Sequence, residues 1–299
     1  MLTNRIESIN LRIGRIRYKL MKALKIESEF SRRIKYRHKT FWTGEGNRDA
    51  IYRTMNANDP IEKWEDIENW QRKLSNKHNS RQFAIKHSCN VPELYWQGRD
   101  VDKIDFSSLP KNFVIRPITG SGGSSIYLIK DSKNLFDGKS YTQQELINSM
   151  SVVIDKHPNQ EFLIEEFVTD EKGNQRIPDD YKFYMFNGEV ACIQIINRLS
   201  PSRGKTSFYD VNWTPLPRVQ LNYATGENQQ APKCLDEMVR AAKDLSRAYK
   251  IFARIDFYAT HKGAVFGEIT PTPFLGSAFT SFGNKLLISK WDKYCKGMI

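Results

Sequence analysis

The sequence predicts an α+β fold built on antiparallel hairpins. Residues 181–198 are expected to form two strands about Asn187-Gly188, a strong signal for a two-residue hairpin turn. Residues 251–270 form a second strand pair with its own glycine turn. The helices that would cover such sheets are expected, from apolar residues recurring every three or four positions, at residues 142–155 and 233–249.

Length and cysteine content restrict the class of protein. A chain of 299 residues can form one large or two ordinary domains. The sequence has no apolar run of about 18 residues for a spanning helix, and we expect no secretory leader because no apolar segment follows the basic N-terminal residues. The four cysteines are far apart and form no CxxC pair. We therefore expect reduced thiols and a cytoplasmic location.

The positive charge is concentrated at the N-terminus. Residues 1–40 contain twelve Lys or Arg and three Glu, within a chain of net charge +12. The apolar residues of this region recur at helical spacing and are Ile6, Ile9, Ile13, Ile16, Leu20 and Leu24. Either this helix docks on the body of the protein, or it is attracted to an anionic membrane surface or a polyanionic substrate. Nucleic acid is a weaker prediction, because no recognition module accompanies the charge.

The segments between this helix and the first hairpin are less regular. Residues 41–60 are expected to form a loop, and Pro60 suits the first turn of a helical stretch that contains Trp64 and Trp70. Residues 91–96 are expected to be extended, and from residue 111 the chain becomes rich in strands.

A glycine-rich segment, "FVIRPITGSGGSSIYLIKD", occupies residues 113–131. Its small residues are Gly120, Ser121, Gly122, Gly123 and Ser124. Backbone N–H groups in such a loop can bind phosphate, although on its own a plain turn between two strands explains the glycines better. The segment is neither a P-loop nor a dinucleotide fingerprint, because no Gly-Lys-Ser/Thr follows and a strand follows instead of a helix.

The late hairpin carries a second candidate site. Arg254 and Asp256 lie two apart on a predicted strand and therefore share a face. Glu268 lies in the returning strand, so the hairpin is expected to bring it to Asp256. Two carboxylates beside phosphates suit Mg²⁺, and an arginine there would stabilise developing negative charge. A surface cross-strand ion pair is the equally weighted alternative.

Two further segments are weaker signals. Asp180 and Lys182 share one face of a predicted strand, where a solvated edge is the simpler interpretation. Residues 165–168 form a connector after an apolar strand, and its backbone is free to face a flat ring.

The order of these elements resembles the ATP-grasp fold. Within it, "DDYKFYMFNGEV", "YDVNW" and "GEIT" are similar to the teichuronopeptide-biosynthesis, or TupA-like, branch. The similarity covers approximately residues 58–285, and "NKHNSR" at 76–81 falls where that branch carries an Asp-Lys-x-x-x-Arg segment. The basic first 50 residues lie outside it.

The resemblance implies two α+β lobes with ATP between them. The expected segments are a basic helical extension at 1–50, a helical segment at 51–110, a glycine-loop ATP-binding lobe at 111–168 and a C-terminal lobe with the metal site at 169–299.

The resemblance also implies a role for each candidate residue. Phosphates would be bound by Lys77, Arg116 and the loop of Gly120, Ser121, Gly122, Gly123 and Ser124. Adenine and ribose would be bound by Glu165, Glu166, Phe167, Val168 and Asp180. The catalytic cations would be Lys182, Arg198 and Arg254, and the Mg²⁺ ligands Asp256, Glu268 and Thr270. Three departures are Arg116 where the superfamily usually has lysine, Thr270 where it often has asparagine, and the missing aspartate of "NKHNSR".

The implied activity is an ATP- and Mg²⁺-dependent carboxylate–amine ligase that works through an acyl phosphate. Its partners would be a small-molecule or glycopolymer-precursor carboxylate and an amine or amino acid, in cell-surface polysaccharide or glycopeptide biosynthesis. The expected location is cytoplasmic, with peripheral contact to the inner face of the membrane through residues 1–40. A kinase on the same scaffold and a non-catalytic anion- or membrane-binding protein remain alternatives.

Overall fold

The fold was analysed in a computed structural model that describes residues 12–16, 18–20, 23–24, 26–39, 48–120, 125–200 and 203–298. Four of the predicted phosphate-binding residues, Ser121, Gly122, Gly123 and Ser124, lie outside the described residues. The same holds for the expected N-terminal helix before residue 12.

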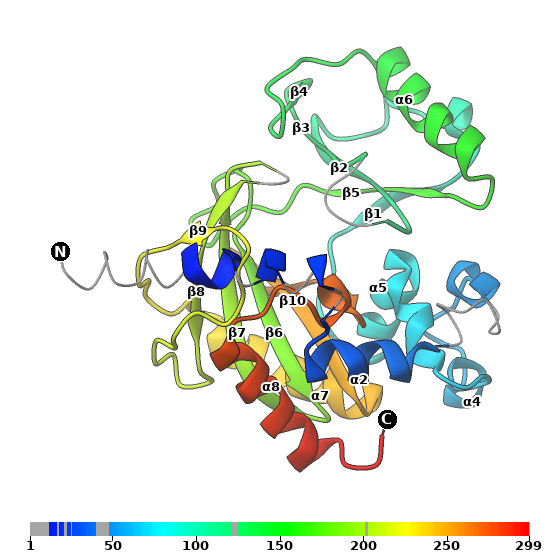
Figure 1. The fold of residues 1–299 in the computed structure, drawn as a ribbon. Helices are drawn as coiled ribbons and strands as arrows, with labels where there is room; N and C mark the ends of the chain where they lie inside the picture. Colours follow the sequence, from blue (N-terminus) through cyan, green and yellow to red (C-terminus); the bar gives the residue numbers. More distant parts are fainter. Residues whose placement is uncertain are drawn as a thin grey trace.

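Two sheets organise the chain (Figure 1). The first has the strand order β1-β5-β2-β3-β4. Its strands are β1 (Leu94–Gly98), β2 (Asn112–Pro117), β3 (Tyr127–Lys130), β4 (Lys133–Asn134) and β5 (Phe162–Glu166). Its described pairs are all antiparallel, and β1 pairs with β5 although it comes from the segment before residue 111.

The second sheet has the strand order β11-β10-β6-β7-β8-β9. Its strands are β6 (Asp180–Phe186), β7 (Glu189–Arg198), β8 (Gly204–Tyr209), β9 (Ala224–Thr225), β10 (Phe252–Thr260) and β11 (Gly263–Thr270). Strands β8 and β9 pair in parallel, and the other described pairs are antiparallel.

Helices flank both sheets (Figure 1). Residues 12–16, 18–20 and 23 are helical. The α-helices with bounds in the described ranges are α2 (Glu29–Arg37), α4 (Ile61–Trp64), α5 (Lys77–Lys86), α6 (Gln143–Lys156), α7 (Leu235–Tyr249) and α8 (Ser281–Tyr294). The 3₁₀ turns are η1 (Arg48–Tyr52), η2 (Trp70–Ser75), η3 (Val101–Lys103) and η4 (Pro273–Gly276). Among the described residues, no helix is long and apolar enough to cross a bilayer.

Both predicted hairpins are confirmed. Phe186 pairs with Glu189, and Asn187 and Gly188 both have positive φ (45° and 91°), as a type I′ turn requires. Thr260 pairs with Gly263 across the second turn. The helical stretch expected after Pro60 is instead divided into α4, η2 and α5.

Local residues explain that division and the ends of the longer helices. Asn69 has left-handed φ and ψ before η2, and the side chain of Asn76 accepts hydrogen bonds from the first N–H groups of α5. Thr142 and Glu145 form a capping box that starts α6. Lys250, in the left-handed region, ends α7.

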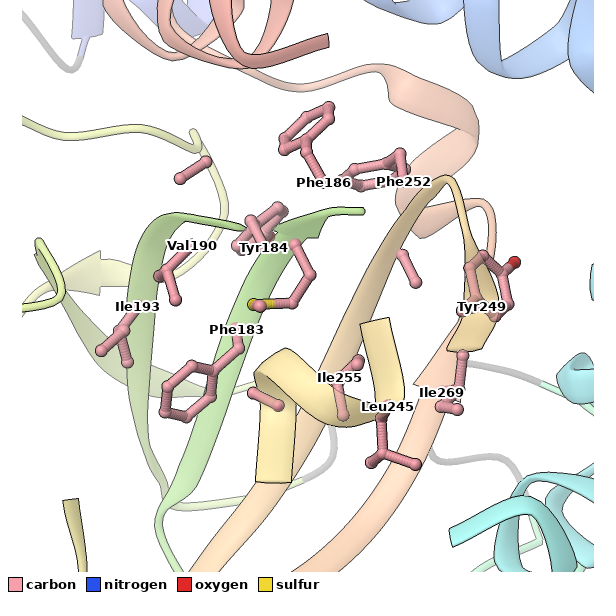
Figure 2. Close-up of a cluster of buried hydrophobic side chains, with 14 of the residues drawn as sticks. Phe183, Tyr184, Phe186, Val190, Ile193, Leu245, Tyr249, Phe252, Ile255 and Ile269 are labelled. Carbon is pink, nitrogen blue, oxygen red and sulfur yellow. The ribbon is translucent and has the colours of Figure 1, made fainter. Parts of the chain in front are cut away.

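The larger core encloses the second sheet on both faces. Figure 2 shows Phe183 and Ile255 on the side where α7 contributes Leu245. On the other face Phe252 meets Phe30 of α2 edge-on, with ring centroids 5.0 Å apart. The sheet is therefore a rigid support for any polar group that it carries.

Candidate active site

One face of the second sheet changes from apolar to charged along its strands. The cross-strand pairs on this face are, in order, Phe186 with Phe252, Tyr184 with Arg254, and Lys182 with Asp256. Side chains two residues apart on a strand share a face, so Asp180 follows Lys182. The aromatic end packs against α2 and α8, and the charged end is the candidate site.

The hairpin of β10 and β11 adds the carboxylate that the sequence predicts. Asp256 lies opposite Glu268, and Arg254 lies opposite Thr270. The expected meeting of Asp256 with Glu268 is confirmed.

Arg254 holds this group together. Its Nε donates to Asp256 Oδ1 and its Nη2 to Asp256 Oδ2, each at 2.7 Å. The same Nη2 donates to Thr270 Oγ1 at 2.8 Å and to Glu268 Oε1 at 3.1 Å. The guanidinium therefore bridges all three predicted metal ligands.

A bulge in β11 explains how the backbone fits here. The register skips from Asp256 opposite Glu268 to Phe257 opposite Phe266, which leaves Gly267 without a partner in the ladder. A Cβ at Gly267 would lie 3.2 Å from the backbone carbonyl oxygen of Asp256 and 3.2 Å from the Tyr258 ring. Only glycine allows this approach without displacing a neighbour.

Strand β6 supplies the next charged residues. Lys182 Nζ donates a hydrogen bond to Asp256 Oδ2 and lies 3.7 Å from Asp180 Oδ1. Arg198, from β7, donates through Nε to Asp180 Oδ2 at 2.9 Å and through Nη1 to the hydroxyl of Tyr223 at 3.3 Å. Lys182 and Arg198 thus join the cluster that the sequence predicts, whereas Tyr223 carried no sequence signal.

The first sheet contributes an ion pair to the same region. Arg116 on β2 binds Glu165 on β5 through two hydrogen bonds, including Nη2 to Oε2 at 2.9 Å. Both side chains are buried, at 10% and 3% exposed. Arg116 also lies 3.4 Å from the carbonyl oxygen of Gly267, which joins the two sheets. Its guanidinium is therefore already paired, and its predicted phosphate contact remains a prediction.

Lys77 contacts the described edge of the glycine loop. It is the first residue of α5, its backbone N–H donates to the Ile118 carbonyl at 2.7 Å, and its Nζ donates to the Gly120 carbonyl at 3.2 Å. Burial lowers the pKa of Lys77, and the nearby Glu268 partly offsets that effect.

The predicted adenine connector separates into two parts. Glu166 is bound to neighbouring residues: its backbone N–H donates to the Glu93 carbonyl at 2.8 Å and its carboxylate pairs with Lys262. Phe167 and Val168 are buried, and among the described residues no hydrogen bond engages their backbone groups. Within the predicted connector, the backbone groups without a described hydrogen bond are therefore those of Phe167 and Val168.

Opposite charges nearly balance in the cluster. Its cations are Lys77, Arg116, Lys182, Arg198 and Arg254, and its carboxylates are Glu165, Asp180, Asp256 and Glu268. Burial alone would raise the pKa of Glu268, but Lys77, Arg254, Lys182 and Arg116 lower it to about 2. At Asp180, burial alone would likewise raise the pKa, but Lys182 and Arg198 lower it below its ordinary value. Both carboxylates are therefore ionised at neutral pH.

Tyr258 is a site residue that sequence reasoning missed. Burial raises its pKa, and the charges near it include Asp180, Arg116 and Glu268. Tyr258 lies two residues after Asp256, so the alternation of side chains along the strand could have placed it on the face of the site. The bulge that brings Gly267 close to the Tyr258 ring leaves no recognisable pattern in the sequence.

The donor set fits a magnesium ion that shares its shell with phosphate. Within the described ranges no group of three or more His, Cys, Asp or Glu residues is suited to a metal. The chain offers two carboxylates and the Thr270 hydroxyl, and Mg²⁺ commonly completes such a set with phosphate oxygens and water. Glu268 is the more open carboxylate, since its side chain is 32% exposed and both described donors approach Oε1. Asp256, at 3% exposed, is held by Arg254 and Lys182.

Comparison with solved structures establishes the class of fold. The D-alanine–D-alanine ligase from Bacillus anthracis matches with a TM-score of 0.50 and 14% identity, over 75% of this chain and 68% of that chain. The D-cycloserine synthetase DcsG matches with a TM-score of 0.49 and 11% identity, over 76% and 72%. The first of these likenesses shows that the chain shares the fold of that protein.

A family model then places the chain more narrowly. The model described as "TupA-like ATPgrasp" matches residues 61–287. The chain therefore belongs to the TupA-like ATP-grasp family, as its motifs predict. No curated protein sequence matches it.

Proposed function

We propose that the protein joins a carboxylate to an amine at the expense of ATP, through an acyl phosphate. The observation that carries the proposal is the cluster between the two sheets. There, Arg254 bridges two carboxylates and a hydroxyl, while Lys77 lies against the start of the glycine loop. Such an arrangement suits phosphoryl transfer, in which positioned cations stabilise charge on the transferring group.

The chemistry requires activation of the carboxylate, because a carboxylate anion has no good leaving group. A carboxylate oxygen attacks the γ-phosphorus of ATP, the bond to the β-phosphate oxygen breaks, and ADP leaves. The amine nitrogen then attacks the acyl carbon, the C–O bond to phosphate breaks, and the nitrogen loses a proton. Lys77 would bind the phosphates, and Arg254 and Lys182 would stabilise negative charge on the transferred group and on the tetrahedral centre.

The nucleotide would contact residues from both lobes. The backbone of Phe167 and Val168 would meet the adenine, and Asp180 the ribose hydroxyls. Arg116, with Glu165, would fix the strand that leads into the glycine loop and add positive charge beside the phosphates. Mg²⁺ would be held by Asp256 and Glu268, with Thr270 at its edge, and would supply neutralising charge to phosphate oxygens.

The acceptor would be anionic and belong to cell-surface polysaccharide or glycopeptide biosynthesis. Residues 197–213 include Arg198 of the cluster and also contain Arg203 and Lys205. These cations suit a sugar acid or a nucleotide-linked sugar. All four cysteines are free thiols, which supports action in a reducing, cytoplasmic compartment.

The test is the release of ADP and phosphate in the presence of candidate carboxylates and amines, with the product followed by mass spectrometry. We expect release to require both substrates and to yield an amide, with Asp256→Asn as the inactive control. A stable phosphorylated product formed without an amine would show a kinase instead. Absence of Mg·ATP binding near millimolar ATP would exclude both activities.

A further inference from the structure

The chain's N-terminal helical residues expose a row of apolar side chains. Residues 12–16, 18–20 and 23 are helical, and the Leu24 N–H donates to the Leu20 carbonyl at 2.9 Å. The exposed side chains are Ile13 (57%), Ile16 (66%), Leu20 (58%), Leu24 (60%) and Ile26 (54%). The apolar face expected from the sequence is thus not buried against the body of the protein.

The body is contacted by other residues of the helix. Arg15 donates through Nη2 to the Tyr223 carbonyl at 2.8 Å and through Nε to the Leu221 carbonyl at 3.3 Å. The Tyr18 hydroxyl lies 3.4 Å from the Ser277 hydroxyl. A Cβ at Gly14 would lie 2.9 Å from Leu221, so the helix backbone approaches closely there.

These contacts fix the direction in which the apolar row points. At about 100° per residue, Gly14, Arg15 and Tyr18 lie on one side of the helix, and Ile13, Ile16, Leu20 and Leu24 on roughly the opposite side. In Figure 1 the dark-blue turns lie near β8 and β9, and Arg15 reaches the residue just before β9. The helix is attached by its polar side with its apolar side toward solvent, the reverse of an ordinary surface helix.

The charge of the segment indicates what covers this row. Residues 12–25 contain six Lys or Arg and no Asp or Glu. A second copy of the same face would bring like charges together, which opposes self-association. An anionic bilayer offers both an apolar layer for the row and negative headgroups for the cations, the combination that interfacial helices bind.

We propose that residues 12–26 bind the surface of an anionic lipid bilayer, with the apolar row inserted among the lipids and the helix lying in the interface. The attachment through Arg15 would hold the body of the protein against the membrane. The proposal does not depend on the ligase reaction, because bilayer binding is measured without turnover.

The experiment is sedimentation of the full chain with vesicles of phosphatidylcholine, alone or mixed with phosphatidylglycerol. We expect binding only to the mixed vesicles, weakened by added salt because screening reduces the attraction between charges. Ile16→Glu combined with Leu20→Glu should reduce binding by about tenfold or more, since the row must enter an apolar layer. Both side chains are more than half exposed, so the unfolding temperature should stay unchanged.

Val152→Glu is the matched control, because Val152 is 52% exposed on α6 of the other lobe. It should bind as the unaltered chain does. Absence of binding to mixed vesicles, equal binding to neutral vesicles, or full binding by the double variant would each overturn the proposal. Self-association without vesicles that the double variant abolishes would also overturn it and assign the row to a second copy.

Discussion

Arg254 donates one hydrogen bond to each carboxylate oxygen of Asp256, both at 2.7 Å, and both side chains are buried. Lys182 reaches the same carboxylate from the next strand. Asp256 is therefore both a predicted metal ligand and the counter-ion of two buried cations, and its substitution tests two properties at once.

Asp256→Asn and Glu268→Gln should both abolish turnover, because each removes a carboxylate charge from the proposed metal site while keeping the side-chain shape. Their stabilities should differ. Asp256→Asn removes the nearest charged partner of the buried Arg254 and Lys182, which keep the longer charged contacts to Glu268 and Asp180, and should cost about 3 kcal/mol. Substitution of the more exposed Glu268 should cost roughly 1 kcal/mol. Urea unfolding and an ADP-release assay measure the two effects. Wild-type activity in either variant would exclude that residue as a metal ligand.

Acid should destabilise the protein partly through Glu268. Its pKa is lowered from 4.5 to about 2 in the folded chain. Because the pKa of Glu268 is lower in the folded chain than in the unfolded chain, its ionised form stabilises the fold at pH values above 4.5. This stabilisation is lost as pH falls from 4.5 through about 2. Asp180, whose pKa is also lowered, acts in the same direction.

In Glu268→Gln, acid should lower the free energy of unfolding by about 1–2 kcal/mol less than it does in the unaltered chain. The measurement is the free energy of unfolding in urea at neutral pH and near pH 3, for the variant and the unaltered chain. Equal losses in the two proteins would show that the surrounding cations do not stabilise an ionised Glu268.

Lys77 and Arg116 should behave differently when each is changed to methionine. Lys77→Met removes a buried cation whose described Nζ hydrogen bond goes to the Gly120 carbonyl, so stability should change by less than about 1 kcal/mol. ATP affinity should fall about tenfold or more, because a phosphate contact is lost.

Arg116→Met leaves Glu165 buried without its partner and should destabilise the fold by about 3 kcal/mol. Combining it with Glu165→Leu should restore much of that loss, since the unpaired charge is removed as well. Calorimetric ATP titration measures the ATP affinity of each variant, and urea unfolding measures its stability. Unchanged ATP affinity in Lys77→Met would remove Lys77 from the phosphate site.

The turn glycine of the first hairpin should be sensitive to a side chain. Gly188 has φ of 91°, and a Cβ there would lie 2.6 Å from Arg247 Cγ. Gly173 is the matched control, with φ of 79° and no atom within 4 Å. Both alanine variants share the backbone strain, of about 1 kcal/mol, and Gly188→Ala should cost roughly 1 kcal/mol more for displacing Arg247. Thermal unfolding compares them, and equal shifts would show that Arg247 moves without cost.

The hairpins were predictable because their signals are local. Asn187-Gly188 selects its turn type from two residues, and alternation places Arg254 beside Asp256 whatever surrounds the strand. Segments with mixed burial were not predicted. In strand β8 the neighbouring residues Thr206 and Ser207 are both buried. In α8 the buried residues form a narrow row along one side, namely Gly283, Leu287 and Trp291.

The pairing within the site depends on how distant segments pack. The sequence contains Arg116 and Glu165 but not their mutual hydrogen bonds, which follow from the register of β2 with β5. It contains Gly267 but not the bulge that directs its carbonyl to Arg116. The sequence shows an amphipathic N-terminal helix, yet the side that meets the body depends on Arg15 and the carbonyls near β9.

The contact between Arg116 and the Gly267 carbonyl brings a charge of the first sheet to the candidate active site on the second. Arg116 belongs to the first sheet, yet it contributes to the low pKa of Glu268 in the second. A greater separation of the two sheets would remove that positive charge from Glu268 and raise the affinity of its carboxylate for protons.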